Sequence, residues 1–215
     1  MLKARLNKVQ VIDSYRRKAK IYDIWGRLTE TKARIRSLEL ADIRNGERIL
    51  EVAVGTGLTF EALLKANPDG QNFGIDLTDA MLEQAAEKAQ ATGLQNYTLS
   101  IGDAYALEFP DHHFDLLVNN YMFDLLPESD FPPVLNEFRR VLKPEGRLVL
   151  INMTKGVRFY EKIWDIVYQI SPDFMGGCRG VQLLPNLQSV GFRNLQREML
   201  SEMTFPSEII TATVS

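Results

Sequence analysis

The feature that most constrains the fold is a regular alternation of short apolar runs and helix-patterned segments between residues 46 and 152. Such alternation predicts an α/β fold with a parallel sheet and helices on both faces. The apolar runs are nearly continuous, which is typical of strands buried on both faces. The expected strands are Arg48–Ala53, Asn72–Asp76, Tyr97–Ile101, Phe114–Asn119 and Arg147–Asn152.

Helical spacing of apolar residues predicts helices over Leu58–Ala66, Asp79–Thr92 and Asp130–Leu142. Thr78 is expected to cap the second of these helices, and Lys143-Pro144-Glu145-Gly146 to stop the third.

The flanking parts of the chain are less regular. Residues 1–45 are expected to be helical up to the turn at Asn45-Gly46. After Met153 the pattern predicts helices over Val157–Ile170 and Val181–Val190. Two terminal strands, Phe192–Met199 and Glu208–Val214, lie close enough in the chain to pair as an antiparallel ribbon.

Composition places the chain among ordinary globular proteins, with 45% hydrophobic and 25% charged residues. No apolar run approaches the roughly 18 residues that a membrane span needs, and the first residues lack the apolar core of a secretory signal. Cys178 is the only cysteine, so no intrachain disulfide is possible. These features predict one domain in the reducing cytoplasm.

The charge is unevenly distributed. Residues 1–36 carry eleven basic and three acidic side chains, whereas the whole chain has a net charge of −3. A basic leader on an acidic body fits peripheral contact with an anionic membrane surface, contact with nucleic acid, or simply a solvated helix face.

Four short motifs lie at the ends of the first four expected strands. The run Glu51-Val52-Ala53-Val54-Gly55-Thr56-Gly57 comes after the first strand and opens a helix, where ligands bind in open parallel sheets. Asp76 ends the second strand and is placed to accept hydrogen bonds from the hydroxyls of a ribose. Gly102-Asp103-Ala104 follows the third strand, where Asp103 suits an adenine amino group. Asn119-Asn120-Tyr121 ends the fourth. The set predicts an adenosine-binding site, and the spacing of the loop fits a dinucleotide enzyme poorly because the third glycine is missing.

The segments LEVAVGTG, FGIDLTDAML, IGDAYALEFPDHHFDLLVNN and RRVLKPEGRLVLIN together resemble the class I S-adenosylmethionine (SAM)-dependent methyltransferases. The resemblance implies a Rossmann-like, seven-stranded mixed sheet of order 3-2-1-4-5-7-6 with strand seven antiparallel. It also implies an N-terminal helical lid (residues 1–45) on a methyltransferase domain (residues 46–215). The nearest groups are the ubiquinone/menaquinone C-methyltransferases and the soluble phosphatidylethanolamine N-methyltransferases. Ala53 departs from the usual glycine of the loop.

The resemblance further implies which residues hold SAM. Glu51 is expected near the methionine amino group, Asp76 at the ribose, and Asn119 beside the methionine part through its backbone. From the lid, Tyr15, Tyr22 or Trp25 is expected to close over the site. The remaining expected contacts are Ala53, Gly55, Gly57, Leu77, Met81, Asp103 and Ala104.

Methyl transfer from a sulfonium needs alignment and water exclusion more than acid–base groups. Tyr121, Asp124, Tyr160 and Asp165 are weak candidates for a base. His112 and His113 lie in a turn before the fourth strand and make a poor zinc site, so no metal is expected. Cys178 lies in a glycine-rich loop without a histidine partner and is expected to be an ordinary small residue.

The sequence therefore predicts a SAM-dependent methyltransferase acting on a small, hydrophobic acceptor, such as a quinone precursor or a lipid head group, and yielding S-adenosylhomocysteine. The apolar segment 157–170 either packs in the core or forms the acceptor pocket. Two alternatives stay open: a catalytically silent SAM-binding partner or sensor subunit, and a nucleic-acid methyltransferase. The acidic body disfavours the latter, so no nucleic acid is expected.

Overall fold

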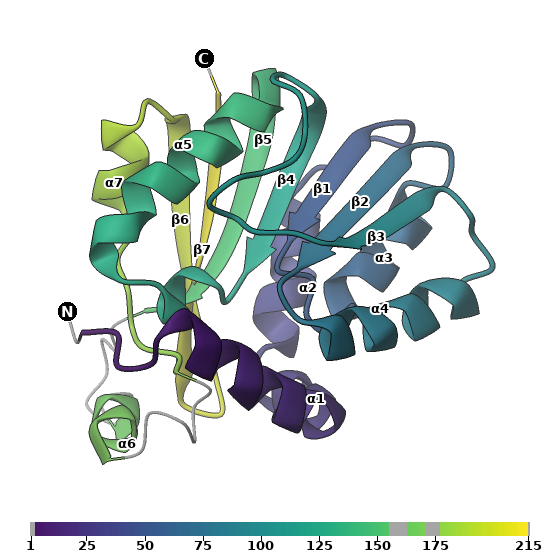
Figure 1. Ribbon diagram of the computed structural model, residues 1–215. Coiled ribbons are helices and arrows are strands. Elements are labelled where there is room, and N and C mark those ends of the chain that lie inside the picture. Colours follow the sequence, from purple (N-terminus) through teal and green to yellow (C-terminus); the bar gives the residue numbers. More distant parts are fainter. Residues whose placement is uncertain (1–2, 155–162, 171–176, 215) are drawn as a thin grey trace.

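The computed structural model describes residues 3–154, 163–170 and 177–214, with the side chains of residues 18–25, 27 and 165 outside that description. Its centre is a seven-stranded sheet of order β3-β2-β1-β4-β5-β7-β6 (Figure 1). The pairs among the first five strands are parallel, whereas β7 runs antiparallel to β5 and β6. The predicted order is thus confirmed. The strands are β1 Arg48–Val52, β2 Gln71–Asp76, β3 Tyr97–Ile101, β4 Phe114–Asn120, β5 Leu142–Met153, β6 Arg193–Glu202 and β7 Phe205–Thr213.

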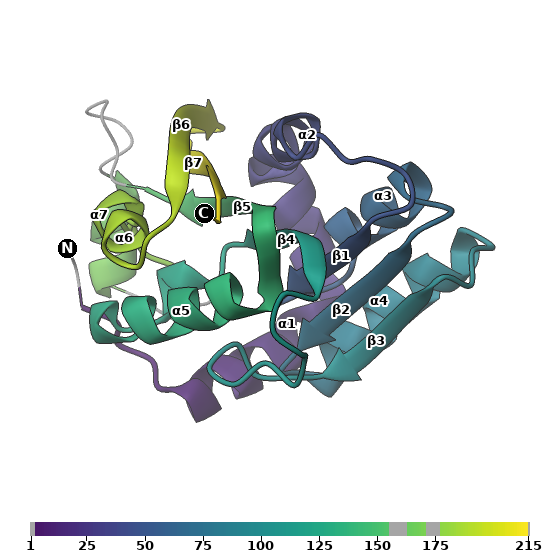
Figure 2. The ribbon, with the colours of Figure 1, turned by 90° about the horizontal axis from the view of Figure 1, so that it is seen from above.

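Helices cover both faces of this sheet (Figure 2). In the core, α5 and α7 pack on one face, and α2, α3 and α4 pack on the other. No helix among the described residues is long and apolar enough to cross a membrane. The helices are α1 Lys8–Thr29, α2 Thr31–Leu40, α3 Leu58–Ala66, α4 Asp79–Ala91, α5 Phe131–Val141, α6 Ile163–Ile170 and α7 Leu184–Ser189, with the short 3-10 helices η1 Phe123–Leu125 and η2 Glu128–Asp130.

Strand β5 shows why the parallel strands are nearly continuously apolar in sequence. Leu148 and Leu150 face α5 and α7, whereas Val149 and Ile151 face the opposite core. Successive side chains of a strand point to opposite faces, so a strand covered on both sides needs apolar residues at every position.

Three local expectations are corrected. Thr78 is the N-cap residue of α4 but makes no side-chain capping bond, because its amide donates to Asp76 and orients the residue toward β2. Lys143–Gly146 lies within β5 rather than before it, since Leu142 already pairs with Phe114. Val181 is not helical, because its amide donates to the Met153 carbonyl at 3.0 Å and extends the pairing beyond β5.

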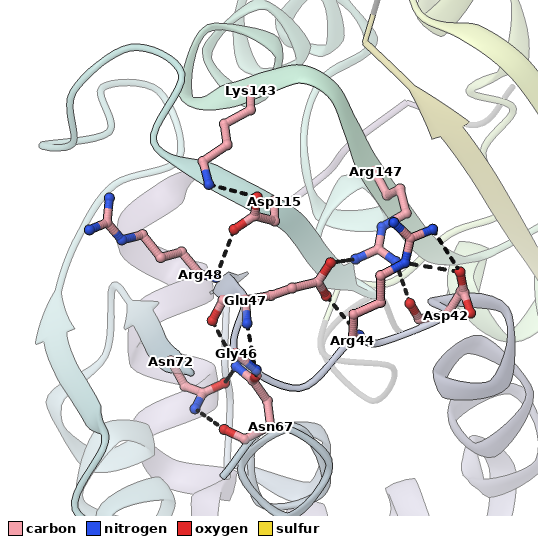
Figure 3. Close-up of polar contacts among 10 residues, drawn as sticks. All are labelled: Asp42, Arg44, Gly46, Glu47, Arg48, Asn67, Asn72, Asp115, Lys143 and Arg147. Atoms are coloured by element: carbon pink, nitrogen blue, oxygen red, sulfur yellow. Dashed lines mark hydrogen bonds and ion pairs between the residues drawn. The ribbon is translucent and has the colours of Figure 1, made fainter. Parts of the chain in front are cut away.

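A polar network closes the amino edge of the sheet (Figure 3). The buried Asn67 side chain donates to the Glu47 carbonyl at 2.9 Å and accepts from the Gly46 amide at 2.8 Å. Arg147 bonds the Glu47 carboxylate, and the Arg48 amide donates to Asp115 at 2.9 Å. These contacts fill the start of β1, β2 and β4, which leaves the opposite, carboxyl edge of the sheet for a ligand.

Candidate active site

Helix α1 passes across the carboxyl edge of the sheet (Figure 1). Between α1, α2 and the ends of β1, β2 and β4 lies a cavity whose empty space, including the part open to solvent, is about 1000 Å³. Its lining includes Val11, Ile12, Tyr15, Glu30, Arg34, Glu51, Ala53, Gly55, Thr59, Asp76, Leu77, Met81, Gly102, Ala104, Asn120, Tyr121, Met122 and Leu125.

Asp76, the last residue of β2, is held rigidly at one end of the cavity. Its two carboxylate oxygens accept hydrogen bonds from the amides of Gly55 and Thr78, each at 2.9 Å. Burial raises the pKa of Asp76, and the amide bonds offset only part of that rise. The carboxylate therefore has a fixed orientation, which suits it to accept hydrogen bonds from a ligand's hydroxyl groups.

Glu51 on β1 is the most unusual acid of the cavity. Its side chain is buried, and its Oε2 has no hydrogen-bond partner in the described part of the chain. Asn120 approaches the other oxygen at 3.5 Å and donates to Thr59 at 2.9 Å. Desolvation raises the pKa of Glu51 well above its ordinary value; Arg34 opposes this rise and Asp76 adds to it. An unsatisfied buried carboxyl costs free energy unless a donor pairs with it, so the site suits a cationic group.

The loop between β1 and α3 approaches the cavity with small residues. Ala53 has φ +59° and Gly55 has φ +56°, both in the left-handed region. A side chain on Gly55 would meet nothing within 4 Å, whereas a Cβ on Gly57 would lie 2.7 Å from the Ala85 backbone. Gly55 therefore leaves ligand space open, and Gly57 instead allows α3 to pack closely on α4.

The comparisons with known proteins identify the family. Residues 49–146 match a family described as a methyltransferase domain. The demethylmenaquinone methyltransferase of Thermotoga maritima is 35% identical over 167 residues, which cover 74% of this chain and 69% of that protein. The chain belongs to the class I SAM-dependent methyltransferases.

The relatives differ in how much of their length is matched. The demethylmenaquinone methyltransferase of Geobacillus kaustophilus is 34% identical over 119 residues, or 55% of this chain, and the chain spans half the length of that protein. A SAM-dependent methyltransferase from Aquifex aeolicus shares the fold, with a TM-score of 0.67, 21% identity, and coverage of 93% of this chain and 98% of that one.

Most of the residues that the sequence assigned to the cofactor surround the cavity of this methyltransferase. Glu51, Ala53, Gly55, Asp76 and the group Leu77, Met81 and Ala104 all line it. The buried Glu51 oxygen, the rigid Asp76 carboxylate and the open space above Gly55 fit SAM, which carries an ammonium group, a ribose and a sulfonium.

Three assigned residues do not line the cavity. Gly57 faces α4, as described above. Asp103 forms an ion pair with Lys8 of α1 at 2.5 Å. Asn119 is fully buried, and its side chain donates to the Val52 carbonyl at 2.8 Å, while its neighbour Asn120 lines the cavity. Strand register decides that Asn120 rather than Asn119 lines the cavity, and the expected backbone contact of Asn119 stays a prediction.

Only two of the four candidate bases, Tyr121 and Asp124, have side chains that the structure describes. Tyr121 lines the cavity, but its hydroxyl bonds Ser207 at 2.8 Å and burial raises its pKa well above the ordinary value. Asp124 is buried away from the lining and accepts from the Met153 amide at 2.9 Å. Tyr160 and the side chain of Asp165 lie outside the described residues, as do the side chains of Tyr22 and Trp25.

Two further predictions concern residues away from the cavity. His112 and His113 precede β4 at the opposite edge of the sheet. Cys178 is buried, and burial raises the pKa of its thiol, with the Tyr15 hydroxyl 3.7 Å from its sulfur. None of these three residues lines the cavity.

The methyltransferase cavity also contains residues that the sequence did not indicate. Glu30 and Arg34, at the junction of α1 and α2, both line it. Glu30 is buried, which is unusual for an acid in a strongly basic leader. The leader carries two further acids, so the sequence did not single out Glu30. Conversely, no described residue of α6 lines the cavity, so the expected acceptor wall from this helix is not seen there.

Proposed function

We propose that this methyltransferase transfers the methyl group of SAM to a small hydrophobic acceptor that carries a ring hydroxyl, such as a quinone precursor. The observation that carries the proposal is a single cavity with two kinds of wall. One end holds the buried acids Glu51 and Asp76, and the side formed by α1 is apolar, with Val11 and Ile12. The names of the curated relatives favour a quinone-type acceptor.

The polar end is proposed to hold SAM. Asp76 accepts hydrogen bonds from the ribose hydroxyls, because its orientation is set by two backbone amides. Glu51 pairs with the methionine ammonium, which satisfies its partnerless oxygen. Leu77, Met81 and Ala104 pack around the adenine.

When bound, SAM supplies a methyl group on a positively charged sulfur, an already activated electrophile. The protein's own contribution is to align the acceptor and to exclude water. Helix α1 provides both, since Val11, Ile12 and Tyr15 line the cavity together with Met122 and Leu125.

Methylation of a hydroxylated ring also releases a proton. Among the described acids around the cavity, Glu51 and Asp76 belong to the polar end that is proposed to hold SAM, whereas Glu30 comes from the α1–α2 side. We therefore assign Glu30 as the group that receives this proton.

The test incubates the protein with methyl-labelled SAM and, separately, a naphthoquinol, a phenol, phosphatidylethanolamine and RNA. We expect label in the quinol or phenol together with S-adenosylhomocysteine. Glu30→Gln is expected to lower kcat, because an amide cannot receive the proton, while leaving the Kd for SAM unchanged. Glu39→Gln, an exposed acid on α2, is the matched control. SAM binding without transfer to any acceptor contradicts the proposal and supports a sensor subunit.

A further inference from the structure

Helix α6 presents an apolar face to solvent. Ile163, Ile166 and Ile170 are 54%, 56% and 80% exposed. They are three and four positions apart, so they lie along one side of the helix. Isolated exposed apolar residues are normal, but an aligned row of isoleucines on one helix marks a contact surface.

The opposite side of α6 is firmly attached. Trp164 donates to the Thr204 carbonyl at 2.9 Å, and its ring packs edge-on against Phe205 with the centroids 5.5 Å apart. The buried Tyr168 donates to the Lys3 carbonyl at 3.0 Å. Because these contacts set the rotation of the helix, the isoleucines cannot turn inward without breaking them.

Positive charge lies beside this apolar row. The N-terminal segment runs next to α6 in both views (Figures 1 and 2), and the Arg5 guanidinium donates to the Gln169 carbonyl at 2.7 Å. Lys3 and Arg5 are exposed. In the sequence, residues 155–162 add three basic residues and one acid directly before α6. Helix α6 itself carries a single charged residue, Asp165.

We propose that the α6 face, defined as Ile163, Ile166 and Ile170 with Lys3 and Arg5, docks the protein on an anionic lipid bilayer. The isoleucines enter the boundary between head groups and acyl chains, and the cations contact the anionic head groups. A partner protein would need to satisfy the apolar row and the cations separately, whereas an anionic bilayer supplies both environments in layers. The proposal does not depend on methyl transfer, because docking is measured without SAM or acceptor.

The test is co-sedimentation of the full chain with phosphatidylcholine vesicles that contain or lack phosphatidylglycerol. We expect binding only to the anionic vesicles. The variant carrying Ile163→Gln, Ile166→Gln and Ile170→Gln is expected to bind the anionic vesicles more weakly, on the order of a hundredfold. The reason is that three apolar side chains no longer enter the bilayer. The variant carrying Lys3→Gln and Arg5→Gln is expected to lose the preference for anionic vesicles.

The matched control carries Ile35→Gln and Ile101→Gln, two isoleucines of similar exposure on α2 and β3. Unchanged vesicle binding by this control supports the α6 face. Equal loss in the control and the α6 variant overturns it, as does unchanged vesicle binding by the α6 variant. Sedimentation velocity tests whether the α6 face is instead an interface between two copies of the chain. A dimer that the α6 substitutions dissociate, while vesicle binding persists, contradicts the proposal. If the protein binds vesicles but transfers no methyl group to any acceptor, the proposed function fails while the docking proposal stands.

Discussion

Individual residues of the cavity hold charge in an environment that disfavours it. Asp76 is buried with two backbone amides as donors, and Glu51 is buried with one oxygen lacking any partner in the described structure. Neither position would be retained for stability, because a buried carboxyl of this kind destabilises the empty protein. Both are understood as binding groups for a ligand that carries hydroxyl and ammonium donors.

Asp76→Ala removes the acceptor proposed to hold the ribose. Hydrogen bonds to charged groups are worth about 1.5–3 kcal/mol each, so the affinity for SAM is expected to fall on the order of a hundredfold. Isothermal titration calorimetry measures the change. Asp69→Ala, at an exposed acid before β2, should leave the Kd unaltered. An unchanged Kd for Asp76→Ala would remove the basis of the cofactor assignment.

Ala53 has a left-handed backbone conformation, with φ +59°. A left-handed non-glycine residue costs about 1–2 kcal/mol, which slightly exceeds the entropy that a glycine adds to the unfolded chain, about 0.5–1 kcal/mol. Ala53→Gly is therefore expected to raise Tm by a few degrees at most and to widen the cavity beside SAM. Ala104→Gly, at a lining residue without positive φ, should lower Tm. A lower Tm for both variants shows that Ala53 is not strained.

At the scale of secondary structure, the position of α1 decides whether the cavity is covered. Two ion pairs join this helix to residues that follow β3 and β2: Lys8 pairs with Asp103 at 2.5 Å, and Arg16 pairs with Asp79 at 3.1 Å. Both pairs are largely exposed, so they contribute little to global stability. Their effect is expected on the opening of α1 instead.

The variant carrying Lys8→Met and Arg16→Met is expected to release SAM faster, by roughly two- to fivefold, with Tm nearly unchanged. High salt should accelerate release from the parent protein in the same way, because exposed charges are screened. Stopped-flow displacement of SAM measures both rates. Arg44→Met, at the exposed pair with Asp42 near the amino edge, is the control. If the double variant retains the parental rate, α1 is not held by these charges.

Helix α6 shows that a local sequence pattern can predict a helix without predicting which of its sides faces the core. Its apolar residues predicted a helix with a core face or an acceptor-pocket face. In the structure Tyr168 packs inward while Ile166 and Ile170 face solvent. An almost wholly apolar helix carries no polar face in its sequence, so only its tertiary contacts determine its rotation.

For the molecule as a whole, buried acids determine how stability depends on pH. Desolvation raises the pKa values of Glu51, Asp124 and Glu208. The folded state then binds more protons than the unfolded state above the ordinary carboxyl range, so the free energy of unfolding falls as pH rises. Asp115 and Glu137 have lowered pKa values, so their ionised forms stabilise the folded protein. This contribution to the free energy of unfolding is lost only at lower pH, where both carboxylates become protonated.

Urea denaturation from pH 5 to pH 8 is expected to give a midpoint that decreases with pH. His113, whose pKa is lowered by burial, acts in the opposite direction near neutrality. Glu51→Gln isolates the carboxyl contribution and should make the slope less negative, whereas Glu87→Gln, at an exposed acid on α4, should not. A midpoint that rises equally with pH in all three proteins contradicts the raised pKa of Glu51.

Much of the fold was readable because each strand and helix carries its own pattern. The alternating segments predicted β1 to β4 to within one residue at each end and located β5, which begins five residues earlier than expected. The family motifs predicted the antiparallel β7. The errors lie where another segment intervenes: Val181 pairs with Met153, and Thr78 turns toward Asp76. In the site, the glycine loop and Asp76 were foreseen, but Glu30 and Arg34 were not, because they meet the cavity from helices distant in the chain.

The sequence by itself determined the order of elements, the double-sided burial of the sheet and the acid at the end of β2, because local periodicity and turn chemistry act over a few residues. Only the tertiary structure decided that Asn120 rather than Asn119 faces the cavity, that Lys8 engages Asp103, and that the isoleucines of α6 are exposed. These outcomes depend on strand register and helix rotation, which are set by contacts between segments far apart in the chain.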